Sequence, residues 1–148
     1  MQRIEIDQSG KIENTTVCSV IADSVGSTVY ISPQTKRGLL RIARSKGKSH
    51  IYVMQTFAFL CARIISKTYS IENHYVIDVE YPNNDGVIKS FLMRYLARFG
   101  IQIRKEQISF SRVGKKSSAH AYAHACYTTK NKKASLMLSL RTITKYLP

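Results

Sequence analysis

The chain has 148 residues and carries 23 Lys and Arg against 9 Asp and Glu, which gives a formal net charge of +14. Its apolar fraction of 44% and its three prolines exclude a disordered polyelectrolyte and predict one domain over residues 1–148. A charge of this size favours a polyanionic partner, either a nucleic acid or an anionic membrane surface, and we expect a nucleic acid.

The cysteines and the apolar stretches bear on the compartment. Cys18, Cys61 and Cys126 are widely spaced and include no CxxC pair, which excludes a zinc ribbon and a disulfide scaffold. We expect them to be small core residues in a reducing, cytoplasmic compartment. The N-terminus has no apolar signal segment, and the most apolar stretch, residues 51–65, is too short to span a bilayer. We therefore expect no membrane contact.

Three short segments rich in β-branched or alternating apolar residues open the chain, with turn residues between them. They predict an antiparallel meander of strands over residues 3–8, 15–22 and 27–32. The basic stretch 33–49 follows, and because it contains Pro33, Gly38 and Gly47 it predicts a loop with one helical turn around residues 39–44.

Helices and strands alternate through the rest of the chain. Apolar residues at helical spacing, with Ser49 as the N-cap, predict a helix over residues 50–67. The next predicted elements are a strand over 71–80, a helix over 87–99, a strand over 107–113 and a helix over 118–128. Residues 134–146 fit either a helix or a strand. The order β-β-β-α-β-α-β-α predicts an α/β fold with a mixed five-stranded sheet and helices on both faces.

Two of the few acidic residues stand at the ends of the first and fourth predicted strands. Asp7 precedes a glycine turn, and Asp78 has Glu80 two residues later on the same face of its strand. Neighbouring strands lie about 4.8 Å apart, so acids on adjacent strands can share a divalent ion. The alternatives are that Asp7 caps the bend at Ser9 and Gly10, and that Glu80 is a solvated surface charge.

This order of elements, with acids on the first and fourth strands, resembles the ribonuclease H-like superfamily, and within it the RuvC-type Holliday-junction resolvases. The segment IEIDQSG (residues 4–10) resembles the first strand of that family, and VID (residues 76–78) resembles its fourth. Residues 117–123 lie where the family has an Asp-x-x-Asp stretch at the start of its last core helix. In this chain Ser117 and His120 occupy those acidic positions.

The resemblance implies a ribonuclease H-like fold that brings Asp7 and Asp78 together. It also implies a divalent-metal-dependent endonuclease that cleaves phosphodiester bonds in DNA, with branched DNA as the expected substrate. Mg²⁺ or Mn²⁺ would be held by Asp7, Asp78 and His120, with Glu80 as a further catalytic acid, and an imidazole ligand favours Mn²⁺. Since symmetric cleavage of a junction needs two sites, a homodimer is expected.

Basic residues gather in two stretches that contain no acid, and they predict contacts with phosphates. The predicted nucleic-acid contacts are Lys36, Arg37, Arg41, Arg44, Lys46, Lys48, Lys115 and Lys116. DNA is expected in preference to RNA. His124 lies four residues after His120 on the same helix face, so the two could act together. The alternative function is a non-catalytic DNA- or RNA-binding protein on the same fold, which the missing acid on the last helix favours.

Overall fold

The computed structural model of the chain describes residues 2–129 and 133–147. Its strands are β1 (Arg3–Ser9), β2 (Ser19–Asp23), β3 (Thr28–Ile31), β4 (His74–Asp78), β5 (Ile108–Ser111) and β6 (Leu136–Met137). They form one mixed sheet in the order β5-β4-β1-β2-β3-β6. The meander β1-β2-β3 is antiparallel, whereas β4 runs parallel to β1, β5 parallel to β4 and β6 parallel to β3.

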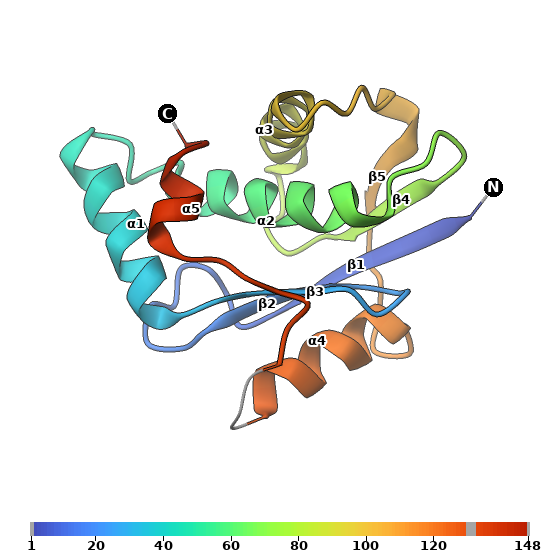
Figure 1. Cartoon of the computed structure of the whole chain (residues 1–148), viewed down its shortest axis with the longest axis horizontal. Helices are drawn as coiled ribbons and strands as arrows, with labels where there is room; N and C mark the ends of the chain where they lie inside the picture. The colour runs from blue at the N-terminus through green and yellow to red at the C-terminus, as the bar shows by residue number, and fades with distance from the viewer. Residues whose placement is uncertain (1, 130–132, 148) are drawn as a thin grey trace.

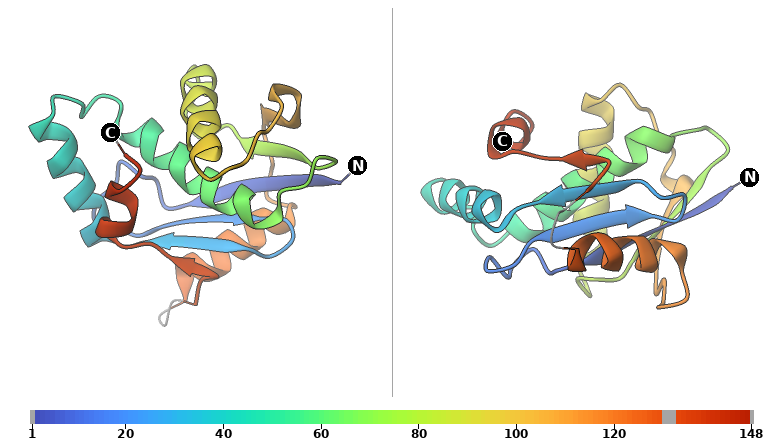
Figure 2. Two further views of the ribbon diagram at one scale, coloured as in Figure 1. Left: turned by 45° about the horizontal axis from the view of Figure 1, so that its top comes forward. Right: turned by 60° about the horizontal axis from the view of Figure 1, so that its bottom comes forward.

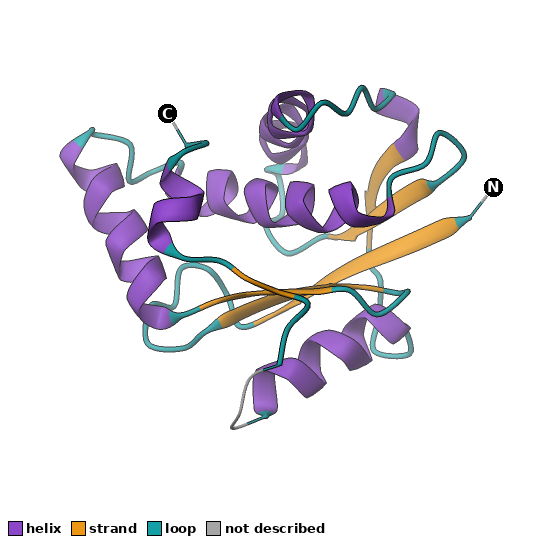
Figure 3. Cartoon of the chain, in the orientation of Figure 1, coloured by secondary structure: helices purple, strands orange, loops and turns teal. Residues whose placement is uncertain are grey.

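Helices cover both faces of this sheet, which makes the fold an α/β fold. They are α1 (Pro33–Ser45), α2 (Tyr52–Thr68), α3 (Asp85–Arg98), α4 (Ser118–Thr128) and α5 (Leu140–Thr144), with a 3₁₀ turn η1 (Lys105–Gln107) before β5. Helix α2 crosses one face with α1, α3 and α5 on the same side, and α4 lies against the opposite face (Figures 1 and 2). Figure 3 shows the helices and strands of the chain with the loops and turns that join them. Helices on both faces were predicted, and this is confirmed.

The period-2 alternation of the strands decides which side chains face α2 and which face α4. Ile4 and Ile6 of β1 join the main core under α2, as does Ile77 of β4. The opposite face carries a smaller apolar cluster in which Val20 of β2 packs with Ala123 of α4. The residues next to Ile6 and Ile77 along their strands therefore point toward α4.

The predicted loop over residues 33–49 is wrong, because most of it forms helix α1. Ser32 caps this helix by accepting a hydrogen bond from the Thr35 backbone N–H at 3.0 Å, and Pro33 stands at the first turn, where proline is favoured. Gly38 lies in α1 where α5 packs closely, since a Cβ built at this position would lie 2.7 Å from the Leu140 side chain. Pro33 and Gly38 were interpreted as helix breakers, and both belong to α1.

Other boundaries differ for local reasons. Residues 10–18 form a loop rather than the start of β2, and within it the Asn14 side chain accepts a hydrogen bond from the Thr16 backbone N–H at 3.2 Å, an arrangement typical of turns. Ser49 does not cap α2, whose N-cap is Ile51. The sheet has a sixth strand, because residues 134–146 contain both β6 and α5.

Cys18, Cys61 and Cys126 are all buried, as predicted for small core residues. Across residues 2–129 and 133–147, none of the helices combines the length and the apolar character needed to cross a membrane.

Candidate metal centre

Sheet register brings the first two acids together. Strands β1 and β4 are parallel neighbours that pair Ile6 with Ile77. Asp7 and Asp78 are the next residues along each strand, so they lie side by side and point to the face that α4 covers. The predicted proximity of the two acids is therefore confirmed, and it follows from the pairing of two apolar residues in the core.

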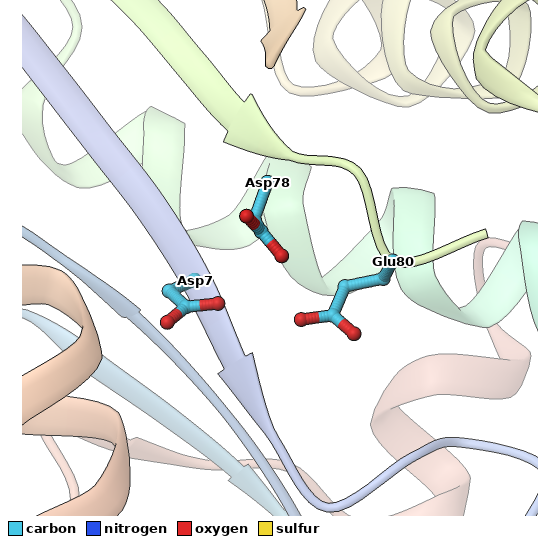
Figure 4. Close-up of side chains that lie close together, drawn as sticks. All are labelled: Asp7, Asp78 and Glu80. Atoms are coloured by element: carbon cyan, nitrogen blue, oxygen red, sulfur yellow. The ribbon is translucent and has the colours of Figure 1, made fainter. Parts of the chain in front are cut away.

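Glu80 joins these acids from the segment after β4. The strand ends at Asp78, and the Glu80 backbone N–H donates to the Asp78 carbonyl at 3.0 Å, so the chain turns at this point. Figure 4 shows all three carboxylates directed toward a common space. Ligand oxygens of Asp7, Asp78 and Glu80 lie within 4.8 Å of one another. Glu80 was predicted to share a strand face with Asp78, but the turn is what places it here.

Hydrogen bonds orient the side chains of both aspartates. Asp7 is buried, and its Oδ2 lies 2.8 Å from Nδ1 of His120, a residue of the first turn of α4. Its Oδ1 accepts the backbone N–H of Gln8 at 2.8 Å. Asp78 Oδ1 accepts the backbone N–H of Val113 at 2.8 Å, which ties the loop between β5 and α4 to the acid group. Both carboxylates are thus oriented by groups from outside their own strands.

Tyr81 fixes the two chain segments that carry the acids. Its buried hydroxyl accepts the side-chain N–H of Gln8 at 3.1 Å and the backbone N–H of Ile12 at 3.2 Å. Its ring packs edge-on against Phe57 of α2, with centroids 5.3 Å apart. Since Glu80 precedes Tyr81 directly, these contacts set the distance between the Glu80 backbone and the end of β1.

The acid group opens into a cavity of about 410 Å³ that also has basic walls. Arg112 and Lys115 line it from the loop between β5 and α4. Gly114 between them has φ +84, a conformation that favours glycine. A phosphate placed in this cavity would have cationic side chains on one side and the acids on the other. A smaller, more apolar cavity of about 250 Å³ lies among α1, α2 and α5, and it carries no acidic residue.

Burial and the neighbouring Asp78 and Asp7 carboxylates raise the pKa of Glu80 to about 8. Three ionised carboxylates this close repel one another, so near neutral pH Glu80 retains a proton unless a cation neutralises the group. The donor set suits a hard divalent ion, since it offers only carboxylate oxygens. Within the described part of the chain, nothing donates to the buried Gln8 Oε1, an amide oxygen on the same cavity wall. The residues present therefore fit Mg²⁺ or Mn²⁺.

His120 and Ser117 take different positions around this centre. His120 contacts Asp7 but is not a member of the close acid group, so its predicted role as a ligand there stays a prediction. Ser117 caps α4 by accepting from the Ala119 backbone N–H at 3.2 Å, and it donates to Glu5 Oε1 at 2.8 Å. Helix α4 thus reaches β1 through a hydroxyl and an imidazole.

One predicted nucleic-acid contact is wrong. Lys36 is fully buried, and its ammonium donates to the carbonyls of Lys11 and Asn14 at 3.0 and 2.7 Å and to the Ser19 hydroxyl at 2.9 Å. It anchors the loop after β1 to α1 and is not available to a phosphate. Burial lowers its pKa to about 8. The charge pattern alone did not distinguish this lysine from its neighbours.

The other predicted basic contacts remain on the surface. Arg37, Arg41 and Arg44 are exposed on α1 at spacings of four and three residues, which places them on one helix face. Lys46, Lys115 and Lys116 are exposed, and Lys48 is half-buried. The Arg37 guanidinium donates to the Thr15 carbonyl at 2.9 Å, so this face begins beside the loop that follows β1.

Sequence reasoning missed Gln8, Tyr81 and Arg112. Their roles depend on contacts between distant segments, and the only local signal is that each lies within two residues of a candidate acid or of the basic turn 114–116. Comparison with family models, with curated proteins and with solved structures finds no match to this chain.

Proposed function

We propose that this protein is a divalent-metal-dependent endonuclease that cleaves phosphodiester bonds in DNA. The observation that carries the proposal is the group of three carboxylates, with oxygens within 4.8 Å of one another, in a cavity that Arg112 and Lys115 also line. The net charge of +14 attracts a polyanionic substrate to the protein surface, and the three carboxylates offer a site for the cations that its cleavage needs.

The topology supports the same proposal. Asp7 and Asp78 lie on β1 and β4, which are parallel neighbours in a mixed sheet that opens with an antiparallel meander. This is the arrangement that the resemblance to ribonuclease H-like nucleases implies. Branched DNA as substrate, and a homodimer that cuts both strands of a junction, follow from the likeness to RuvC-type resolvases and belong to the proposal.

The residues of the cavity have different roles in the proposed reaction. Asp7, Asp78 and Glu80 would hold Mg²⁺ or Mn²⁺, which would supply a water of lowered pKa and neutralise charge that develops on the phosphate. His120 orients Asp7 through the contact at Nδ1. Arg112 and Lys115 bind the phosphate that enters the cavity, and their charges favour the extra negative charge of the transition state.

Basic residues away from the cavity would hold the DNA backbone. The exposed face of α1 formed by Arg37, Arg41 and Arg44 follows the loop that leaves the acid centre. Contacts of this kind are made to phosphates, so they add affinity that falls with salt and they read no base sequence. Lys46 and Lys48 follow α1 along the chain, and Lys116 lies next to Lys115 on the loop between β5 and α4.

A cleavage assay tests the proposal. The purified protein is incubated with a labelled four-way DNA junction, a matched duplex and a single strand, in Mg²⁺ and separately in Mn²⁺. We expect cleavage that depends on the metal and favours the junction. Asp7→Asn should abolish it, whereas Glu106→Gln, which makes the same charge change at an exposed site, should not.

The alternative is a DNA- or RNA-binding protein without catalysis. It is favoured by α4, which contributes His120 and Ser117 where the family has acids. In the same assay this alternative predicts tight binding without cleavage in either metal, and equal binding by wild type and Asp7→Asn.

A further inference from the structure

Two histidines stand one turn apart on α4. His120 and His124 are at i and i+4, and their rings are parallel, with an interplanar angle of 5° and centroids 6.1 Å apart. The His120 side chain is 34% exposed, and His124 is exposed. The residues at 121 and 125 beside them are alanines, so no bulky side chain from their own helix separates the rings.

The contact with Asp7 fixes which nitrogen of His120 is available. The 2.8 Å contact is a hydrogen bond when the His120 ring carries its hydrogen on Nδ1 and the Asp7 carboxylate accepts it. The lone pair of the neutral ring then lies on Nε2. Histidines that bind metals usually donate their other ring N–H to a carboxylate in this way. His124 is exposed, and in the part of the chain that the structure describes no hydrogen bond or ion pair engages its ring nitrogens.

Two imidazoles at i and i+4 on one helix face bind zinc once rotation about their side-chain bonds brings one nitrogen of each ring to the same ion. Imidazole nitrogen suits Zn²⁺, Ni²⁺, Co²⁺ and Cu²⁺, whereas carboxylate oxygen suits Mg²⁺ and Mn²⁺. Transition-metal ions therefore favour the histidine pair, whereas Mg²⁺ and Mn²⁺ favour the three carboxylates. Asp7 belongs to the carboxylate group and also contacts His120.

We propose that His120 and His124 form a second metal site on α4, which binds Zn²⁺ or a similar transition-metal ion through His120 Nε2 and a ring nitrogen of His124. Metal on Nε2 makes the Nδ1–H of His120 a stronger donor to Asp7 and draws negative charge from that carboxylate. Zinc at this site therefore weakens Mg²⁺ binding at the acid centre, and Mg²⁺ weakens zinc binding by the same factor. The coupling rests on the proposed carboxylate centre, whereas zinc binding itself does not.

Imidazole NMR spectra of the metal-free, ¹⁵N-labelled chain test the site without DNA. Titration with Zn²⁺ should shift the ring signals of His120 and His124 at one equivalent and leave those of His50 and His74 in place. His124→Ala should lower the zinc affinity at least about tenfold, whereas His50→Ala, at another exposed histidine, should not change it. The amide spectrum of each variant reports whether it is folded.

Zinc shifts that appear at other residues, or a folded His124→Ala variant that binds zinc as wild type does, would overturn the site. A zinc affinity that is unchanged by saturating Mg²⁺ would overturn the coupling to Asp7. A failure of the nuclease proposal looks different, because a protein that cleaves no DNA still shows the ring shifts on α4.

Discussion

The pH dependence of divalent-metal binding is a direct consequence of the Glu80 environment. Since the pKa of Glu80 is raised to about 8 by burial and by the Asp78 and Asp7 carboxylates, a cation that binds the three acids must displace its proton. The apparent dissociation constant then scales inversely with the deprotonated fraction of Glu80. It should be about tenfold higher at pH 7, and about a hundredfold higher at pH 6, than at a pH well above 8.

The sign of the corresponding stability effect follows from the same shift. The folded chain retains a proton on Glu80 that an unfolded glutamate loses near its ordinary pKa of 4.5. Folded chains therefore bind more protons between pH 4.5 and about 8, and the contribution of Glu80 to the unfolding free energy is lost as the pH rises through that window. Bound Mg²⁺ should reverse this loss.

Calorimetric titration with Mg²⁺ at pH 6, 7 and 8, in buffers of different ionisation enthalpy, measures both the affinity and the protons released. We expect release approaching one proton per binding event at pH 6. Glu80→Gln should remove that release and flatten the pH dependence, whereas Glu72→Gln, at an exposed site, should leave both unchanged. Wild-type affinity that is constant from pH 6 to 8, with no proton release, would refute the reasoning.

Further substitutions test three other features of the structure: the buried lysine, the Tyr81 anchor and the basic cavity wall. Lys36→Met should cost about 3 kcal/mol in urea unfolding, because buried acceptors of a charged donor lose their partner. Since burial lowers the pKa of Lys36 to about 8 and an unfolded lysine titrates near 10.5, stability in wild type should rise with pH between these values relative to the variant, and parallel curves would contradict this. Tyr81→Phe should cost about 1–3 kcal/mol by the same unfolding measurement, because two N–H groups lose a buried acceptor, and a loss below the error of the measurement would argue against its anchoring role. Arg112→Ala and Lys115→Ala should each weaken DNA binding and reduce the salt slope by about 1, whereas exposed Lys67→Ala near the end of α2 should weaken it less, and equal losses at all three would show that the cavity walls make no special contact.

The acid pair could be predicted from sequence because it rests on short-range patterns. Alternation places Asp7 and Asp78 on the face of the sheet that Ile6 and Ile77 do not occupy. Because β1 and β4 are parallel neighbours that pair Ile6 with Ile77, the two acids then lie side by side. The position of Glu80 was predicted for a different reason from the one observed, since the chain leaves the sheet before reaching it.

The remaining parts of the site depend on tertiary structure. Burial of Lys36 requires α1 to pack beside the loop after β1, and the sequence of α1 was interpreted as a loop because Pro33 and Gly38 look like breakers in isolation. The Tyr81 anchor joins segments 73 residues apart, which no local pattern reports. Helix propensity and charge patterning are weak where packing decides the outcome.

Crystals of the protein soaked in Mn²⁺ give the most direct test of the acid centre, through the anomalous scattering of manganese. The account predicts a strong anomalous peak among the carboxylates of Asp7, Asp78 and Glu80, and its loss in Asp7→Asn crystals under the same soak. The absence of an anomalous peak in this cavity at a saturating Mn²⁺ concentration would contradict the proposed metal centre, whatever nucleic acid the protein binds.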